Sequence, residues 1–174
     1  DQLRDQGINK IILMSHLQQI SLEEELAGLL DGVDIIMAGG SNALLADEGD
    51  SLFPGTGQKP YDAYPIMTKD ASGNDVVLVN TDGGWRYVGQ LTVEFDQNGN
   101  VIADAINDAT STIHTATDAT AVSLWGSEEA AYAEGSKGDI AQELVGAVDA
   151  IVTAKDGITF GMTDVYLQGE RTFV

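Results

Sequence analysis

The sequence predicts an α/β fold: a βαβ unit near the N-terminus, then mostly antiparallel strands and a C-terminal helix. Two apolar runs rich in β-branched residues, 11–14 and 33–38, each end at small or polar residues. Between them, residues 22–30 carry leucines at helical spacing, with three glutamates near the start. Because strand, helix and strand follow one another within about thirty residues, we expect the two strands to be parallel.

The predicted helix has one apolar side. That side is formed by four leucines, Leu22, Leu26, Leu29 and Leu30. In open α/β sheets, ligands bind at the carboxyl ends of the parallel strands. We therefore expect His16, which follows the first strand, and the loop 39–42, which follows the second, to lie beside one site.

Two segments rich in Asp, Asn and Gly, 70–75 and 96–100, separate apolar runs farther along the chain. Their spacing allows a calcium loop as an alternative. However, the twelfth position counted from Asp96 is Asn107, where an EF-hand loop needs an acidic residue. Gly and Asn supply the left-handed backbone of tight turns, so the pattern favours two hairpin turns.

The longest predicted strand runs from Tyr87 to Phe95 and is preceded by two glycines and Trp85. An aromatic residue in such a place typically packs against a neighbouring strand, and contact with a ligand or another domain is the alternative. The preceding loop, 46–62, is rich in Gly, Pro and Asp and long for a compact domain, so it is either functional or mobile.

Residues 107–137 lack a clear period and predict an irregular surface segment in which His114 is an exposed polar residue. Apolar residues then recur at helical spacing to about residue 153. The expected organisation is thus a main domain over 1–106, the irregular segment 107–137, a helix and linker over 138–163, and the start of another domain at 164–174.

The chain is strongly acidic. Its 174 residues include 28 acidic and 8 basic side chains, which give a net charge of −20, and no cysteine. Such a charge repels nucleic acids and anionic membranes, so neither is an expected partner. No apolar run is long enough to span a bilayer. The scattered acidic groups favour a solvated surface, and a calcium-binding surface is the alternative.

Several of these segments together resemble the second half of the metallophosphoesterase domain of the 5'-nucleotidase and 2',3'-cyclic phosphodiesterase family. The resemblance covers most of the chain and is looser over residues 107–137. It rests on residues 7–16, 33–36, 44–45, 64–66, 76–80, 87–91, 95–100 and 163–171.

The resemblance implies part of an α/β/β/α sandwich and a centre of two divalent metal ions that hydrolyses phosphate esters. It places metal ligands at His16 and Asn42, whereas Gly40 stands where the family usually has a histidine. It identifies no catalytic residue in this chain. Three metal-binding stretches expected before Gly7 are not in the sequence, so the resemblance implies a fragment whose partners are the missing N-terminal half and a C-terminal domain.

Two functions follow from this resemblance. The first is a piece of a 5'-nucleotidase-like, metal-dependent phosphoric ester hydrolase that acts on nucleotides or related monoesters and is inactive by itself. The second is a non-catalytic acidic scaffold that assembles or binds cations at a surface, as Gly40 and the net charge suggest. In either case we expect an extracellular, periplasmic or cell-surface location. The unpaired sheet edge of a fragment also predicts self-association.

Overall fold

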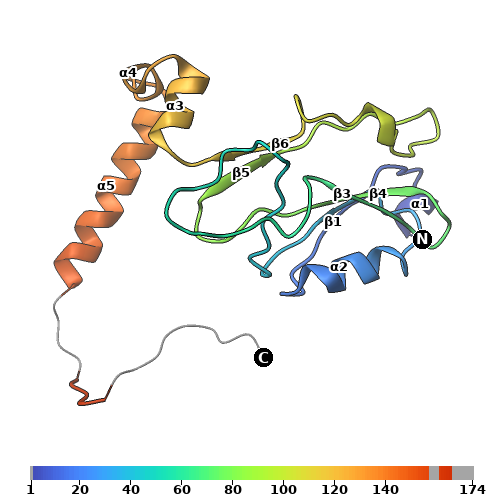
Figure 1. The fold of residues 1–174 in the computed structure, drawn as a ribbon, viewed down its shortest axis with the longest axis horizontal. Helices are drawn as coiled ribbons and strands as arrows, with labels where there is room; N and C mark the ends of the chain where they lie inside the picture. The colour runs from blue at the N-terminus through green and yellow to red at the C-terminus, as the bar shows by residue number, and fades with distance from the viewer. Residues whose placement is uncertain (1, 157–160, 166–174) are drawn as a thin grey trace. The chain divides into compact units, whose positions relative to one another are not determined.

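The computed structural model describes residues 2–156 and 161–165 (Figure 1). The chain forms two compact units, Asp1–Leu124 and Trp125–Val174. The first holds both β-sheets, and the described residues of the second include a short and a long helix. The start of another domain expected at 164–174 lies largely outside the described residues.

A four-stranded sheet organises the larger unit. Its strands, in spatial order, are β1 (Ile12–Met14), β2 (Ile35–Met37), β4 (Asp75–Val79) and β3 (Ile66–Lys69). β1 pairs with β2 and β2 with β4 in parallel, whereas β3 pairs with β4 antiparallel. The predicted parallel βαβ unit is therefore confirmed.

Helix α2 (Ile20–Ala27) connects β1 to β2 and lies on one side of the sheet (Figure 1). The leucines of this segment are not the buried positions, because Leu22 is 41% and Leu29 is 73% exposed. The carboxylate of Glu23 bonds inward to the preceding loop, and this fixes the rotation of the helix. The buried positions of the helix are Ile20, Glu23 and Ala27.

The core of the larger unit is centred on β4. Val76, Val77 and Leu78 are each at most 1% exposed, so this strand is covered on both faces. β1, in contrast, is an edge strand whose Ile12 and Met14 are 58% and 78% exposed. β1 is thus the unpaired sheet edge that the sequence led us to expect, and it also exposes apolar surface.

A second sheet lies on the side of the first sheet opposite α2 (Figure 1). It pairs β5 (Tyr87–Gln90) antiparallel with β6 (Thr112–Thr115). β5 is shorter than the strand predicted over 87–95. Burial alternates beyond it, because Leu91, Val93 and Phe95 are half-buried while the residues between them are exposed. The short 3-10 helix Ala103–Ala105 follows.

The two Asx-rich segments form hairpin turns, as predicted. The Asp70 carboxylate accepts hydrogen bonds from Gly32 N, Ser72 N and both nitrogens of Asn74. Burial opposes ionisation of this carboxyl, but these hydrogen bonds outweigh it and hold its pKa below the usual value. Asp96 occupies the same position in its own turn and accepts hydrogen bonds from the second and fourth residues after it.

Residues 107–137 are not the irregular segment that the sequence predicts. They contain β6, α3 (Asp118–Trp125) and the short helix α4 (Glu128–Ala131). Local polar contacts stabilise this regular structure where no long hydrophobic period exists. Three threonine hydroxyls, those of Thr115, Thr117 and Thr120, bond one another at the start of α3.

The long helix predicted near the C-terminus is confirmed as α5 (Lys137–Lys155). The Ser136 hydroxyl caps it by accepting from Asp139 N, and the Asp139 carboxylate accepts in return from Gly135 N. The remaining described α-helix, α1, spans Gln2–Asp5. Among the described residues, none of the helices is both long and apolar enough to cross a membrane.

Candidate functional site

The carboxyl ends of β1 and β2 bring together the two segments that the sequence predicts to meet. The His16 ring, which follows β1, lies directly against the loop that follows β2. Its Nδ1 is 3.2 Å from the point where a Cβ on Gly39 would lie, and its Nε2 is 2.6 Å from the corresponding point on Gly40. The predicted proximity of His16 and the loop 39–42 is therefore correct.

Gly40 is the residue that makes this close approach possible. Its φ is +82°, in the left-handed region that favours glycine. A side chain here would also meet the His16 ring, whose Cδ2 is 3.0 Å from the Cβ position. The family resemblance implies a histidine at position 40. In this chain the ring of His16 fills the space that a side chain on Gly40 would need.

Glu23 supports the turn that carries His16, a role that sequence reasoning missed. It is fully buried. Its Oε1 accepts hydrogen bonds from Leu17 N at 3.0 Å and from the Ser15 hydroxyl at 3.2 Å, one on each side of His16. Oε2 has no hydrogen-bond partner among the described residues. Glu23 stands among three consecutive glutamates, so nothing in the sequence distinguished it.

Asn42 lies at the end of the loop, with a left-handed backbone at φ 53°. Its Oδ1 is directed at Gly83, where a Cβ would be 2.5 Å away. Asn80, at the end of β4, anchors the loop. Its amide nitrogen donates to the Ser41 hydroxyl at 2.9 Å and to Ala43 O at 2.8 Å. The position of Asn42 therefore depends on the ends of both β2 and β4.

A cavity of about 660 Å³ lies beside this loop. It extends between the carboxyl ends of the strands and the start of β5, and His16 is not among the residues that line it. Its lining residues are Met14, Met37, Ala38, Gly39, Gly40, Asn42, Tyr64, Val79, Asn80, Thr81, Asp82, Gly83, Trp85 and Gly89.

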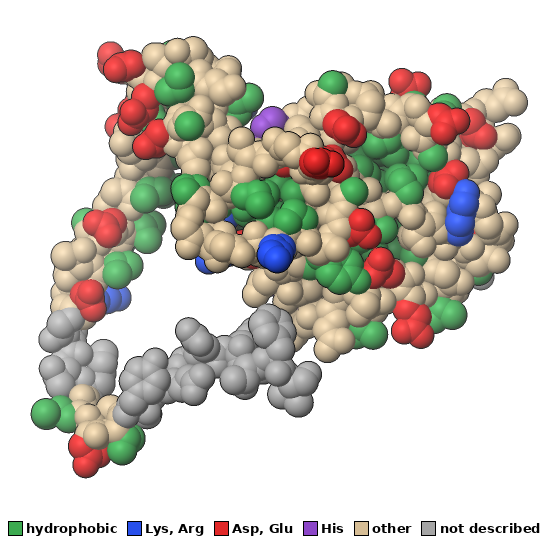
Figure 2. Space-filling model, in the orientation of Figure 1, with side chains coloured by type: hydrophobic (Ala, Val, Ile, Leu, Met, Phe, Trp, Pro, Cys, Tyr) green, Lys and Arg blue, Asp and Glu red, His purple; other side chains and the backbone are tan. Residues whose placement is uncertain are grey.

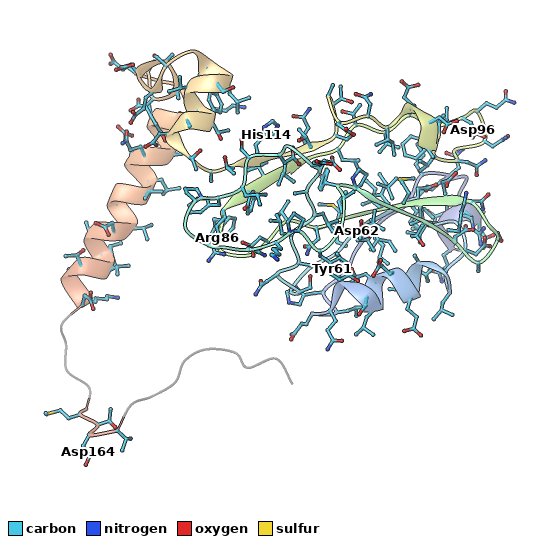
Figure 3. The ribbon with its side chains drawn as sticks, viewed as in Figure 1. Tyr61, Asp62, Arg86, Asp96, His114 and Asp164 are labelled. Atoms are coloured by element: carbon cyan, nitrogen blue, oxygen red, sulfur yellow. The ribbon has the colours of Figure 1, made fainter. Side chains whose placement is uncertain are left out.

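Trp85 lines this cavity. The sequence led us to expect that it packs against a neighbouring strand, and the structure shows that it does not. It is 95% exposed and has φ +60°, an uncommon conformation for a bulky residue. Hydrogen bonds to Asp82 hold the loop that carries it. Arg86, labelled in Figure 3, donates from Nη1 to Asp82 Oδ2 at 2.8 Å, and Gly83 N donates to Asp82 Oδ1 at 2.6 Å. These contacts hold the loop while the indole stays in solvent.

His114, the second histidine, lies elsewhere. It lines a different cavity of about 620 Å³, and its Nε2 is 3.3 Å from Gln90 Oε1 (Figure 3). It is half-buried in β6, not a fully exposed residue. The structure therefore separates the two histidines between two cavities.

The donor atoms at the loop are of the kinds that bind a divalent metal ion, but they are too few for a two-metal centre. No hydrogen bond among the described residues uses the ring of His16 or the side-chain amide of Asn42, so an imidazole nitrogen and an amide oxygen are available. Asp82 is the carboxylate in the cavity lining, and its ion pair with Arg86 already occupies it. Within the described ranges, no group of three or more His, Cys, Asp or Glu side chains could hold a metal ion. The residues present do not complete a two-metal centre.

The acidic side chains do not concentrate at this site. Figure 2 shows them scattered over the visible face of the molecule, with few basic groups among them. This distribution agrees with the solvated surface that the composition favours.

The fold and the strand-end loops define an α/β protein of the metallophosphoesterase type, and comparison with solved structures gives the same class. A 5'-nucleotidase precursor from Thermus thermophilus superposes with a TM-score of 0.65 and 25% identity, over 88% of this chain and 25% of that protein. The NAD nucleotidase of Haemophilus influenzae superposes with a TM-score of 0.54 and 28% identity, over 66% of this chain and 21% of that protein.

Sequence comparison points to the same family. A 5'-nucleotidase from Homo sapiens is 31% identical over 103 residues, which are 59% of this chain and 17% of that protein. A probable 5'-nucleotidase from Treponema pallidum is 34% identical over 121 residues, 67% of this chain and 19% of that protein. A snake venom 5'-nucleotidase from Crotalus adamanteus is 32% identical over 101 residues, 58% of this chain and 16% of that protein. No family model matches the sequence.

These similarities confirm the resemblance predicted from the sequence: the chain is a relative of the 5'-nucleotidases. It spans less than a fifth of the length of the human and Treponema pallidum proteins.

Proposed function

We propose that this chain is part of a metal-dependent phosphoesterase of the 5'-nucleotidase type, which hydrolyses phosphate monoesters of nucleotides or related compounds. The observation that supports this most directly is the contact between His16 and the loop 39–42 at the carboxyl ends of two parallel strands. The relatives named above are nucleotidases, and the chain superposes on one of them over 88% of its length. In this proposal His16 and Asn42 each bind a divalent ion.

The remaining ligands of such a centre come, in this proposal, from a further part of the protein. A two-metal centre needs several ligands for each ion, and this chain offers an imidazole and an amide. Further protein structure also has a place to bind, because β1 is a sheet edge with an exposed apolar face. Covering that face removes apolar area from water, and added strands satisfy the open backbone groups of the edge.

A location outside the cytoplasm belongs to the same proposal. Several of the relatives are named as snake venom proteins, and the net charge of −20 suits a surface in cation-rich surroundings.

A second candidate function is a non-catalytic acidic scaffold that retains the phosphoesterase fold and binds cations or assembles with other proteins. The glycine at position 40 supports it, because the site lacks the histidine that the family resemblance implies there. The open edge of β1 supports assembly, since an unpaired strand is a ready template for pairing with another chain.

The test is release of inorganic phosphate from adenosine 5'-monophosphate with Mn²⁺ present. The 174-residue chain is compared with a longer protein that carries it together with the additional ligand stretches. The phosphoesterase proposal expects turnover from the longer protein, its loss on adding EDTA, and none from the chain alone. A longer protein that folds and binds Mn²⁺ without releasing phosphate would overturn the proposal in favour of the scaffold.

A further inference from the structure

The cavity of about 620 Å³ that His114 lines follows the edge of strand β6. All four residues of this strand, Thr112–Thr115, line it, although successive side chains of a strand point to opposite faces of a sheet. A cavity that meets all four therefore runs along the edge of the strand. Residues within 49–54 and 117–124 supply the rest of the lining, so the cavity is a groove between a loop and helix α3.

This edge of β6 is open. In the part of the chain that the structure describes, β6 pairs with β5 and with no other strand. Ala116 N donates to Arg86 O at 2.7 Å, so these two opposite residues form a hydrogen-bonded pair. Bonded and non-bonded pairs alternate along an antiparallel ladder, so the N–H and C=O groups of Ile113 and Thr115 point away from β5, toward the groove.

These outward backbone groups are nearly buried and incompletely paired. Ile113 is 5% and Thr115 is 6% exposed. Thr117 N donates to Thr115 O at 2.9 Å, whereas no hydrogen bond of the described residues outside the β5–β6 ladder uses Ile113 N, Ile113 O or Thr115 N. Buried backbone groups without partners are costly, and an added strand supplies the donors and acceptors that such an edge lacks.

The surroundings of the groove are acidic. Asp50 is a lining residue, and neither Lys nor Arg is among the described residues that line the groove. Burial raises the pKa of Asp47, and the nearby charges of Asp108 and Asp50 raise it further, so three carboxyls act on one another here. A second copy of this chain, with a net charge of −20, would bring the same acidic surface against the groove. A positively charged occupant is therefore the complementary one.

The side chains of the groove suit the long side chains of Lys and Arg. The hydroxyls of Thr115, Thr117 and Thr120 bond one another. Each hydroxyl oxygen can accept two hydrogen bonds, so this cluster has acceptor sites left for an ammonium or guanidinium group. Leu52 and Leu124, which are 39% and 51% exposed, offer apolar contact to the methylene stem of such a side chain.

We propose that the groove along the open edge of β6 binds an extended, positively charged segment of a partner protein, which pairs with β6 as an additional strand. The backbone of this segment bonds Ile113 and Thr115, and its Lys or Arg side chains reach Asp50 and the threonine hydroxyls. A segment of about four to six residues is enough to span the strand. The groove is separate from the loop 39–42, so this inference goes beyond the proposed phosphoesterase function and does not depend on it.

The first experiment titrates the 174-residue chain into a fluorescein-labelled hexapeptide of alternating lysine and threonine and follows the fluorescence anisotropy. Two further peptides separate the two contributions. Glutamate in place of lysine reverses the charge, and methylation of every backbone nitrogen keeps the charge but removes the donors of the added strand. The lysine peptide should bind to saturation, and each of the other two should bind at least about tenfold more weakly.

Amide hydrogen exchange, measured by NMR, reports on the added strand itself. The saturating lysine peptide should slow the exchange of the Ile113 and Thr115 amides about tenfold or more. Ala116 is the control amide, because it already donates to Arg86, and its exchange should stay within about twofold.

Variants then locate the site. S123W places a bulky ring in the groove and should weaken binding of the lysine peptide about tenfold or more, whereas V122W adds the same ring on α3 at a position outside the lining and should bind as the parent does. D50N removes a charge from the groove and should weaken binding about threefold. D104N is its control, because Asp104 is exposed and outside the lining.

Three results overturn the inference. The first is equal binding of the lysine peptide and its N-methylated form, which would mean attraction by charge without an added strand. The second is parent-like binding by S123W while circular dichroism shows that the variant is folded. The third is protection of Ile113 and Thr115 that rises with protein concentration in the absence of peptide, since a second copy would then occupy the edge.

Discussion

Substituting Gly40 by alanine tests the geometry of the candidate site most sharply. Two effects act at this position. A residue with a Cβ costs about 1–2 kcal/mol in the left-handed conformation, and the new methyl group meets the His16 ring, whose Nε2 is 2.6 Å away. Ordinary contacts lie near 3.5 Å or beyond, so the ring must move by about 1 Å. The exposed ring can turn toward solvent, so this second effect adds little to the loss of stability.

Gly73→Ala is the matched control. Gly73 has φ +87°, almost the value of Gly40, but nothing lies within 4 Å of its Cβ position. Both variants should lose about 1–2 kcal/mol of unfolding free energy, measured in urea. They should differ in the imidazole region of the proton NMR spectrum, which contains two histidines. In G40A the His16 signals shift while those of His114 stay in place, and in G73A neither moves.

Two results would refute this reasoning. If the His16 signals in G40A match those of the parent chain, the ring does not occupy the space beside Gly40. If G40A is destabilised far more than G73A, the backbone of the loop, not the mobile ring, opposes the added methyl group.

The remaining predictions concern Glu23, the buried aspartates and the exposed face of β1. E23A should lower the unfolding free energy by about 2–4 kcal/mol, because it removes the partner of buried polar groups and leaves a cavity. E23Q should lower it by less. Equal losses for the two variants in urea unfolding would contradict this reasoning. The pKa of Asp70 is lower in the folded state than in the unfolded state. The ionised carboxyl therefore stabilises the fold above its unfolded-state pKa of about 4, and this stabilisation is lost as the pH falls through the folded-state pKa. The cost of D70N at pH 7 should therefore shrink below about pH 4. Burial raises the pKa of Asp34, so the sign reverses, and D34N should gain stability relative to the parent as the pH rises from about 3 to about 7. M14K should reduce self-association in sedimentation velocity without lowering stability, and unchanged association would mean that another surface is responsible.

The sequence predicted those parts of the fold that follow from strong local patterns. Two β-branched runs around a helical segment are enough to define a parallel βαβ unit, and parallel strands necessarily place His16 and the loop 39–42 at the same edge. The hairpin turn at Asp70 was predictable for a similar reason, because the Asx and Gly positions of a turn carry their own signal.

The parts that the sequence did not predict depend on contacts distant along the chain. Glu23 faces inward because of hydrogen bonds to the preceding loop, and hydrophobic spacing carries no sign of these bonds. Strand β6 is regular because β5 pairs with it, although its Thr-rich sequence has no hydrophobic period. Trp85 is exposed in a loop where Arg86 pairs with Asp82, and a sequence pattern carries no sign of that pairing.

The central claim is that His16 belongs to a phosphoesterase metal site, and one comparison tests it directly. Mn²⁺-dependent release of phosphate from adenosine 5'-monophosphate is measured for a longer protein that carries this chain, and for its H16A and H114A variants. His114 is the matched control because it lies at a different cavity. H16A should lower kcat/KM by about 100-fold or more, since it removes a metal ligand, and H114A should leave it within about twofold. Equal activity of H16A and the parent protein would contradict the account.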